Sequence, residues 1–103
     1  MKKTLAGTEV DVNEEGYLTD MSQWNAAIAD AIAAEEGVGP LTDDHQKVIN
    51  YLRDLQSKNA SITIRGVGKS GVVTTKELYA LFPGGPLKKA SKIAGIPKPV
   101  GCI

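Results

Sequence analysis

The sequence predicts an α+β fold: a mainly helical array of about five helices, with a small N-terminal antiparallel β-meander and a flexible C-terminal arm. Three observations lead to this prediction. Residues 1–20 alternate weakly between apolar and polar types, later segments repeat apolar residues at helical spacing, and residues 95–103 contain two prolines and two glycines. We expect one domain, residues 1–94, followed by a mobile arm at residues 95–103.

The N-terminal meander is predicted from short stretches of alternation that turn residues separate. Gly7 and the cluster at residues 13–16 supply the turns. The apolar positions expected to face the core are Leu5, Val10, Val12 and Leu18.

The first helix is predicted to follow Asp20, a residue type that caps helix N-termini. Trp24, Ile28 and Ile32 recur every four residues and mark one buried face, and Gly37 is a typical stop. Because of this spacing, we expect the only tryptophan, Trp24, to anchor the core rather than to hold a ligand.

A second helix is predicted to begin after Thr42, because two aspartates in its first turn suit the positive end of the helix dipole. It fades near Asn59. The only histidine, His45, has no co-ligands, so a structural role is expected and a metal site is not. The buried stripe of this helix comprises Val48, Ile49, Leu52 and Leu55.

Residues 60–73 are ambiguous, because Ile62 and Ile64 alternate as in a strand while three glycines weaken any helix. The stretch GVGKSG matches the end of a phosphate-binding loop, but Thr63 occupies the position of the required first glycine. We therefore favour a glycine-rich turn between short helices over a nucleotide site.

Two more helices are predicted from the residues at their ends. Thr74 and Glu77 form a capping-box pattern for a helix that ends before Pro83. Pro86 suits the first position of the last helix, which stops at Gly95.

The formal net charge is zero, but the charges are unevenly distributed. Residues 1–44 contain ten acidic residues and two lysines, whereas residues 45–103 contain two acidic and ten basic residues. Either the two halves neutralise each other within the fold, or the second half presents a basic face to an anionic partner. A helix-turn-helix between residues 42 and 82 leaves a weak nucleic-acid contact open, although the lysines are spread over several elements.

Chemistry is expected at Cys102, the only cysteine and the second-to-last residue. A thiol there suits thiol chemistry delivered to a partner protein, which needs no metal or organic cofactor. No apolar run approaches the roughly 20 residues that cross a bilayer, and no apolar stretch follows the first two lysines as in a signal peptide. We therefore expect a cytoplasmic protein without a membrane partner, in which the thiol stays reduced.

The arm is predicted to be extended, because Pro97 and Pro99 exclude a helix, while Gly101 gives the cysteine local freedom. Nine residues can span roughly 30 Å, which is enough to insert a thiol into the active site of another protein. A frayed chain end is the alternative.

The thiolate is the reactive form of cysteine; the nearby terminal carboxylate disfavours it and nearby cations favour it, and the sequence leaves both effects open. We predict that Arg65, Lys92 and Lys98 stabilise the anionic sulfur or dock the arm, and that Gly101 belongs with them to the partner-binding set. Solvated surface side chains without a binding role are the alternative for the three cations.

Five segments follow one another along the chain: GYLTDMSQW, LTDDH, INYLRDL, LYALFPGGP and KIAGIPKPVGCI. Their order and spacing resemble the DsrC/TusE family of sulfite reductase gamma-subunit-like and sulfur-relay proteins. The resemblance covers residues 16–103 and implies a small β-meander packed on an array of helices. It also implies that the penultimate cysteine, here Cys102, carries sulfur on a mobile arm.

The chain departs from this family pattern at two places. In the sulfite-reductase branch a second cysteine lies eleven residues before the penultimate one, and that position here is Ser91. A hydroxyl cannot form a disulfide or a trisulfide, so the resemblance favours the single-cysteine, TusE-like branch. The segment between Arg65 and Leu81 is also shorter and richer in glycine than the family pattern.

The resemblance implies sulfur-donor and sulfur-acceptor proteins as partners. A TusE-like, sulfurtransferase-type carrier would take persulfide sulfur from a TusBCD-like complex and pass it to a tRNA thiolase. A DsrC-like gamma subunit would instead work with sulfite reductase subunits. A non-catalytic, regulatory DNA-binding homologue is a third alternative.

Overall fold

Two short strands open the chain. In the computed structural model, which describes residues 1–99, β1 (Lys2–Leu5) and β2 (Thr8–Asp11) pair as an antiparallel hairpin. The turn residue Gly7 has a φ of 75°, a conformation that glycine adopts without steric cost. An isolated bridge joins Val12 to Leu18. The predicted antiparallel meander is confirmed in this small form.

Helix α1 (Ala26–Glu35) begins later than the sequence predicts. Asp20 does cap a helix, but that helix is the short 3-10 turn η1 (Met21–Gln23). The backbone of Trp24 is then extended (φ −74°, ψ 142°), and Asn25 caps α1. The prediction that the first helix follows Asp20 directly and contains Trp24 is therefore wrong. Two good cap residues lie close together here, and the local pattern does not decide between them.

Helix α2 (Asp43–Ser57) starts after the predicted cap residue. At its start, Nδ1 of His45 accepts a hydrogen bond from the backbone N–H of Thr42 (3.0 Å). Nε2 then carries the proton and donates to the carbonyl of Leu81 (2.9 Å). Phe82 packs edge-on against the imidazole ring. His45 is buried between these partners, so its expected structural role is confirmed.

The ambiguous glycine-rich segment forms a short helix, α3 (Ile64–Gly68), rather than a strand. The hydroxyl of Thr63 caps it by accepting a hydrogen bond from the N–H of Gly66 (2.9 Å). Helix α4 (Thr75–Leu81) follows with the predicted capping box, and α5 (Pro86–Ile93) starts at the predicted proline.

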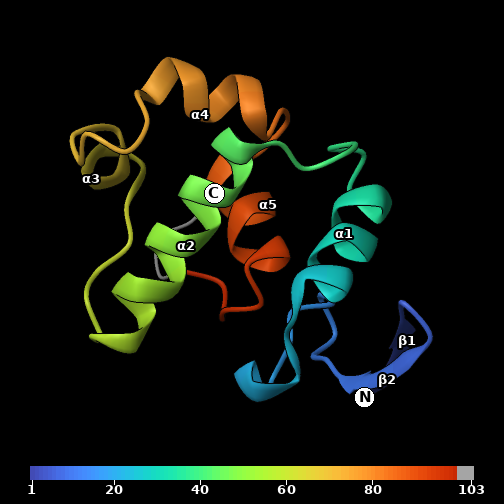
Figure 1. Ribbon diagram of the computed structural model, residues 1–103. Coiled ribbons are helices and arrows are strands. Elements are labelled where there is room, and N and C mark those ends of the chain that lie inside the picture. The colour runs from blue at the N-terminus through green and yellow to red at the C-terminus, as the bar shows by residue number, and fades with distance from the viewer. Residues whose placement is uncertain (100–103) are drawn as a thin grey trace.

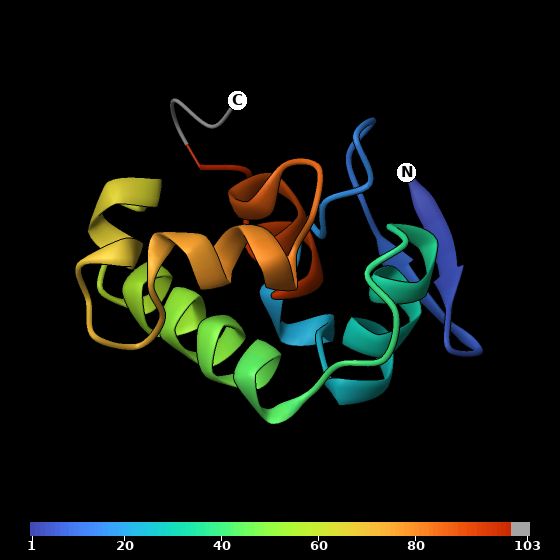
Figure 2. The ribbon, with the colours of Figure 1, turned by 90° about the horizontal axis from the view of Figure 1, so that it is seen from above.

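Helix α5 lies at the centre of the fold and packs against α1, α2 and α4. Figure 1 shows α5 behind α2, with α1 on its other side, and Figure 2 shows the hairpin beside α1. Within the described chain, every helix is too short or too polar to cross a bilayer. The largest fully buried side chains include Tyr17, Leu18, Ile28, Ile32, Ile49, Leu52, Leu78, Phe82, Ile93 and Ile96.

Candidate functional site

Cys102 and Gly101 lie outside the described part of the chain. The structure does describe the segment that leads to them. Gly95 and Ile96 are buried, and the exposed chain begins at Pro97. The first two residues of the predicted arm therefore belong to the packed body, and the mobility of the arm stays a prediction.

Helix α5 ends in a Schellman motif, which turns the chain sharply away from the helix axis. Gly95 has a φ of 70°, and its N–H donates to the carbonyl of Lys92 (3.2 Å). The N–H of Ile96 donates to the carbonyl of Ser91 (3.2 Å). The side chain of Ile96 is fully buried, so this turn is held by packing as well as by hydrogen bonds.

Two side chains from distant elements contact the end of α5. The Nε1 of Trp24 donates to the carbonyl of Ile93 (2.8 Å), and Nη1 of Arg53 on α2 donates to the carbonyl of Ala94 (2.7 Å). The guanidinium carbon of Arg53 lies 4.1 Å from the centre of the Trp24 ring. Partial burial lowers the pKa of Arg53, but a guanidinium stays protonated at neutral pH. The core role predicted for Trp24 is confirmed, because it packs against the hydrophobic cluster.

Sequence reasoning missed Arg53. It follows the buried residue Leu52 in α2, and no local pattern distinguishes it from a solvated arginine. Its partner carbonyl lies 41 residues further along the chain. Only the packing of α2 against α5 brings the two together.

A groove of about 450 Å³ lies beside the segment that leaves α5. One wall is the end of α2 with its connection to α3, and the other is the start of the arm. The groove surface is mixed: amide and hydroxyl groups on one wall and an ammonium group on the other lie among apolar groups. Its lining residues are Gln56, Asn59, Ala60, Ser61, Ile62, Thr63, Pro97, Lys98 and Pro99.

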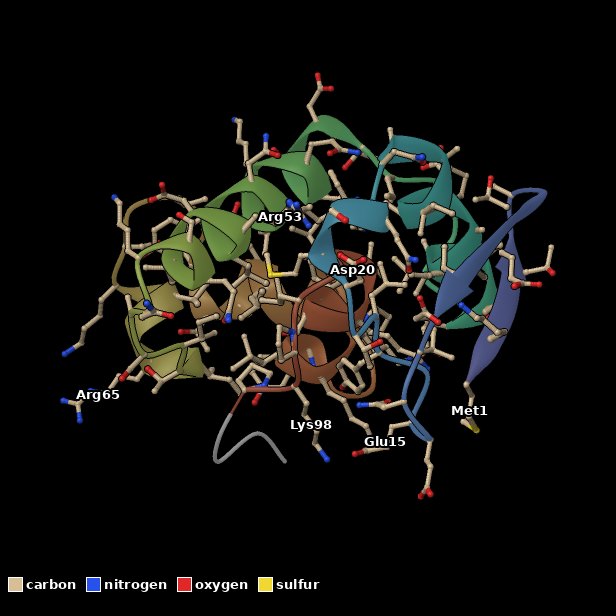
Figure 3. All side chains as sticks on the ribbon, turned by 90° about the horizontal axis from the view of Figure 1, so that it is seen from below. Met1, Glu15, Asp20, Arg53, Arg65 and Lys98 are labelled. Atoms are coloured by element: carbon tan, nitrogen blue, oxygen red, sulfur yellow. The ribbon has the colours of Figure 1, made fainter. Side chains whose placement is uncertain are left out.

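The three cations that were predicted to stabilise the anionic sulfur or to dock the arm lie in different parts of the fold. Lys98 lines the groove, and its Nζ lies 3.1 Å from a carboxylate oxygen of Glu15 in an exposed ion pair. Arg65 is exposed on α3 and has no ion pair with any residue of the described chain. Figure 3 shows Arg65 and Lys98 along one edge of the molecule, well separated in that view.

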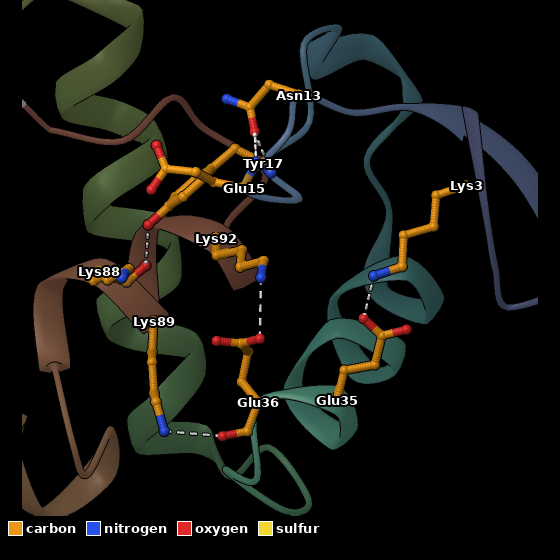
Figure 4. A network of polar contacts seen from close by, with 9 residues as sticks. All are labelled: Lys3, Asn13, Glu15, Tyr17, Glu35, Glu36, Lys88, Lys89 and Lys92. Atoms are coloured by element: carbon orange, nitrogen blue, oxygen red, sulfur yellow. Dashed lines mark hydrogen bonds and ion pairs between the residues drawn. The ribbon is translucent and has the colours of Figure 1, made fainter. Parts of the chain in front are cut away.

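Lys92 lies inside a polar network rather than at the groove (Figure 4). Its Nζ is 3.0 Å from Glu36, and only 15% of its side chain is exposed. The ammonium lies 6.0 Å from the centre of the Tyr17 ring, and neighbouring Lys89 donates to the Glu36 carbonyl (2.9 Å). Together with Lys98, Lys92 therefore joins the basic second half of the chain to the acidic first half.

Ser91 faces the interior of the fold from α5. It is fully buried, and its hydroxyl has no hydrogen-bond partner within residues 1–99. The same range contains no group of three His, Cys, Asp or Glu side chains that could hold a metal ion. That Cys102 carries the chemistry of the site stays a prediction.

Comparison with known proteins identifies the family. A family model described as DsrC-like protein matches residues 4–103. The chain is 38% identical over 101 residues to the dissimilatory-type sulfite reductase gamma subunit of Nitratidesulfovibrio vulgaris strain Hildenborough, covering 97% of this chain and 96% of that protein. It is 41% identical over 105 residues to the sulfurtransferase TusE of Escherichia coli strain K12, covering 94% of this chain and 95% of TusE.

The fold agrees with this sequence similarity. A chain from the crystal structure of dissimilatory sulfite reductase I superposes with a TM-score of 0.86 at 36% identity, and both chains are covered completely. The sequence and the helical array around α5 thus lead to the same relatives, and the chain belongs to the DsrC-like protein family.

Proposed function

We propose that this protein is a sulfur-relay carrier that accepts and passes on persulfide sulfur through Cys102. The observation that supports it most is a family match over residues 4–103 in a chain with a single thiol. Relatives that align with nearly the whole chain are named as a sulfurtransferase and as a sulfite reductase gamma subunit. Both names refer to sulfur chemistry.

The transfer step is a displacement at sulfur. The thiolate of Cys102 attacks the terminal sulfur of a donor persulfide, R–S–SH. A new S–S bond forms at Sγ, the S–S bond of the donor breaks, and the donor leaves as the thiolate R–S⁻. The terminal sulfur keeps its oxidation state, so no oxidant, metal or organic cofactor takes part. An acceptor thiolate then removes this sulfur in the same way and regenerates Cys102.

The groove beside the arm is our proposed docking region. Covalent geometry keeps the Cα of Cys102 within about 11 Å of the Cα of Pro99, which lines that groove. Lys98 and Arg65 are exposed and suited to an anionic partner surface, and Gly101 adjoins the thiol. Lys92 and Lys98 already have ion-pair partners, so each supports docking only if its pair opens.

The single thiol favours a TusE-like relay. Because Ser91 cannot bind sulfur, persulfide sulfur on Cys102 has no second cysteine within the chain to move to. It passes to another protein instead, as in a relay from a TusBCD-like complex to a tRNA thiolase. We place this exchange in the cytoplasm, where thiols stay reduced. A weak contact between the basic residues and tRNA stays a prediction.

A second candidate function is that of a gamma-type partner of dissimilatory sulfite reductase. Two observations favour it: the 38% identity to such a gamma subunit and the TM-score of 0.86 to a chain from a sulfite reductase crystal structure. In this role Cys102 would receive sulfur from the reductase subunits. The absence of a second cysteine from the sequence is the observation against it.

Intact-mass spectrometry tests the carrier proposal directly. After incubation with glutathione persulfide, we expect the protein to gain the mass of one sulfur atom and to lose it on reduction. Cys102→Ser is the matched control, because it changes one atom and removes the only thiol. A mass gain that persists in Cys102→Ser, or no gain in the wild type, would contradict the proposal.

The two candidate partners are separated by offering the sulfur-loaded protein to each. A TusE-like carrier passes its sulfur to a tRNA thiolase and does not bind sulfite reductase subunits. A gamma-type partner binds sulfite reductase subunits and does not pass its sulfur to a tRNA thiolase.

A further inference from the structure

We infer that Trp24 and Arg53 are positioning residues that fix the direction in which the arm leaves the body. We call this pair the arm-root clamp. The inference rests on the proposed function, because the direction of the arm matters for sulfur transfer only if Cys102 carries the sulfur. The observations behind it concern the last carbonyls of α5, the packing at Gly95 and the origin of the two side chains.

All four terminal carbonyls of α5 have a hydrogen-bond donor. A helix leaves its last four carbonyls without partners inside the helix. The Schellman motif supplies backbone N–H groups to two of them, and the clamp supplies side-chain donors to the next two. In order, the donors are Ile96 to Ser91, Gly95 to Lys92, Trp24 to Ile93 and Arg53 to Ala94.

The clamp also leaves no space for a side chain at Gly95, the residue that follows the C-cap Ala94. A Cβ built on Gly95 would lie 2.3 Å from Cδ1 of Trp24 and 2.7 Å from its Cγ. The indole therefore packs directly on the backbone where the chain changes direction. Its other neighbour is the guanidinium of Arg53, 4.1 Å from the ring centre.

The charge of Arg53 suits this place. A cation at the C-terminus of a helix interacts favourably with the negative end of the helix dipole. Arg53 adds a hydrogen bond to a carbonyl and a cation–π contact with Trp24, so it joins α2, the segment before α1 and the end of α5. These contacts link the arm root to three parts of the fold at once.

The described residues after Gly95 continue in the direction that the chain takes at Gly95. Pro97 and Pro99 each have a restricted φ, whereas glycine has the least restricted backbone of all residues. Without the clamp, Gly95 would therefore be the described arm residue at which the chain direction varies most. A change of angle at Gly95 displaces every later residue, including Cys102. Fixing Gly95 therefore fixes the direction of the chain as far as Pro99, from which the remaining residues start.

Hydrogen exchange on the free protein tests the clamp without any sulfur chemistry. In Arg53→Ala we expect the amides of Gly95 and Ile96 to exchange at least about tenfold faster, because a charge-assisted bond at the turn is lost. Arg53→Lys keeps the charge and one donor and should restore part of the protection. Lys47→Ala is the matched control, because it removes an exposed cation from the same helix.

A second readout follows the thiol itself. The chain has one tryptophan and one cysteine, so energy transfer from Trp24 to an acceptor dye on Cys102 needs no further mutation. We expect a broader distance distribution in Arg53→Ala than in the wild type, and no change in Lys47→Ala. For the other half of the clamp, Trp24→Phe should raise the exchange rate at Ile96 as Arg53→Ala does.

Two results would overturn the inference. One is exchange that accelerates uniformly through α2 and α5 in Arg53→Ala, since that indicates a merely structural role. The other is an unchanged Trp24–Cys102 distance distribution despite faster exchange at Gly95. Because neither assay uses a persulfide, failure of the clamp is distinguishable from failure of the carrier proposal.

Discussion

Trp24 packs against the backbone of Gly95 just after α5, although the two residues are far apart in the sequence. The tryptophan ring lies where a side chain at position 95 would have to be, and the φ of Gly95 is 70°. Glycine is therefore required here for two independent reasons: the backbone conformation and the missing space.

Gly95→Ala should lower the free energy of unfolding by more than about 3 kcal/mol, because the left-handed conformation alone costs about 1–2 kcal/mol and Trp24 must also move. Gly37→Ala is the control. Its φ of 74° is similar, but nothing lies within 4 Å of a Cβ there. Urea unfolding of both variants measures the difference, and equal losses would show that packing against Trp24 contributes nothing.

Ser91→Ala should stabilise the protein by about 1 kcal/mol, because it removes a buried hydroxyl that lacks a partner within residues 1–99. Ser57→Ala serves as the control: Ser57 is exposed near the end of α2, and its hydroxyl donates only to the Asp54 carbonyl within the same helix (2.7 Å). Thermal and urea unfolding give the two changes in stability. A loss of stability in Ser91→Ala would indicate that its hydroxyl has an acceptor in the native protein.

The capping box of α4 should make stability depend on pH. Hydrogen bonds from the backbone and side chain of Thr74 lower the pKa of Glu77 below its ordinary value of 4.5. A carboxyl with a lowered pKa stabilises the fold above pH 4.5 and loses this contribution as pH falls through the lowered value. Glu77→Gln should therefore be less stable than the wild type at pH 7, and this difference should shrink at pH 3. A constant difference in urea unfolding at both pH values would count against this assignment.

Two of the ion pairs that join residues 1–44 to residues 45–103 should differ in strength. Lys92 and Glu36 are 15% and 23% exposed, whereas Lys98 and Glu15 are 35% and 50% exposed. Lys92→Met leaves a largely buried carboxylate unpaired and should lower the free energy of unfolding by about 2 kcal/mol. Lys98→Met should cost less than about 1 kcal/mol, because the solvent screens an exposed pair. Chemical denaturation measures the free energy of unfolding of both variants. An equal loss in the two would disprove this ranking.

Much of the fold can be predicted from the sequence, because helix ends depend on residues three or four positions apart. Thr42, the Thr74–Glu77 pair, Pro86 and Gly95 each mark an end that the structure confirms. The same local reasoning fails after Asp20, where a second cap residue lies nearby.

The candidate site, like the fold, could be predicted from the sequence only in part. The sequence identifies Cys102 as the only thiol, with Ser91 eleven positions before it. It also draws attention to Arg65, Lys92 and Lys98, but it cannot show that Lys92 is buried beside Glu36 while Arg65 is exposed. Those differences depend on which helix faces are covered.

The sequence by itself determined most helix ends, the family and the single thiol, because each depends on residue identity and short spacing. Only the tertiary structure decided what contacts the end of α5. Trp24 and Arg53 reach its carbonyls across 69 and 41 residues of chain. Such contacts depend on how helices pack against one another in three dimensions, and no local repeat in the sequence encodes that packing.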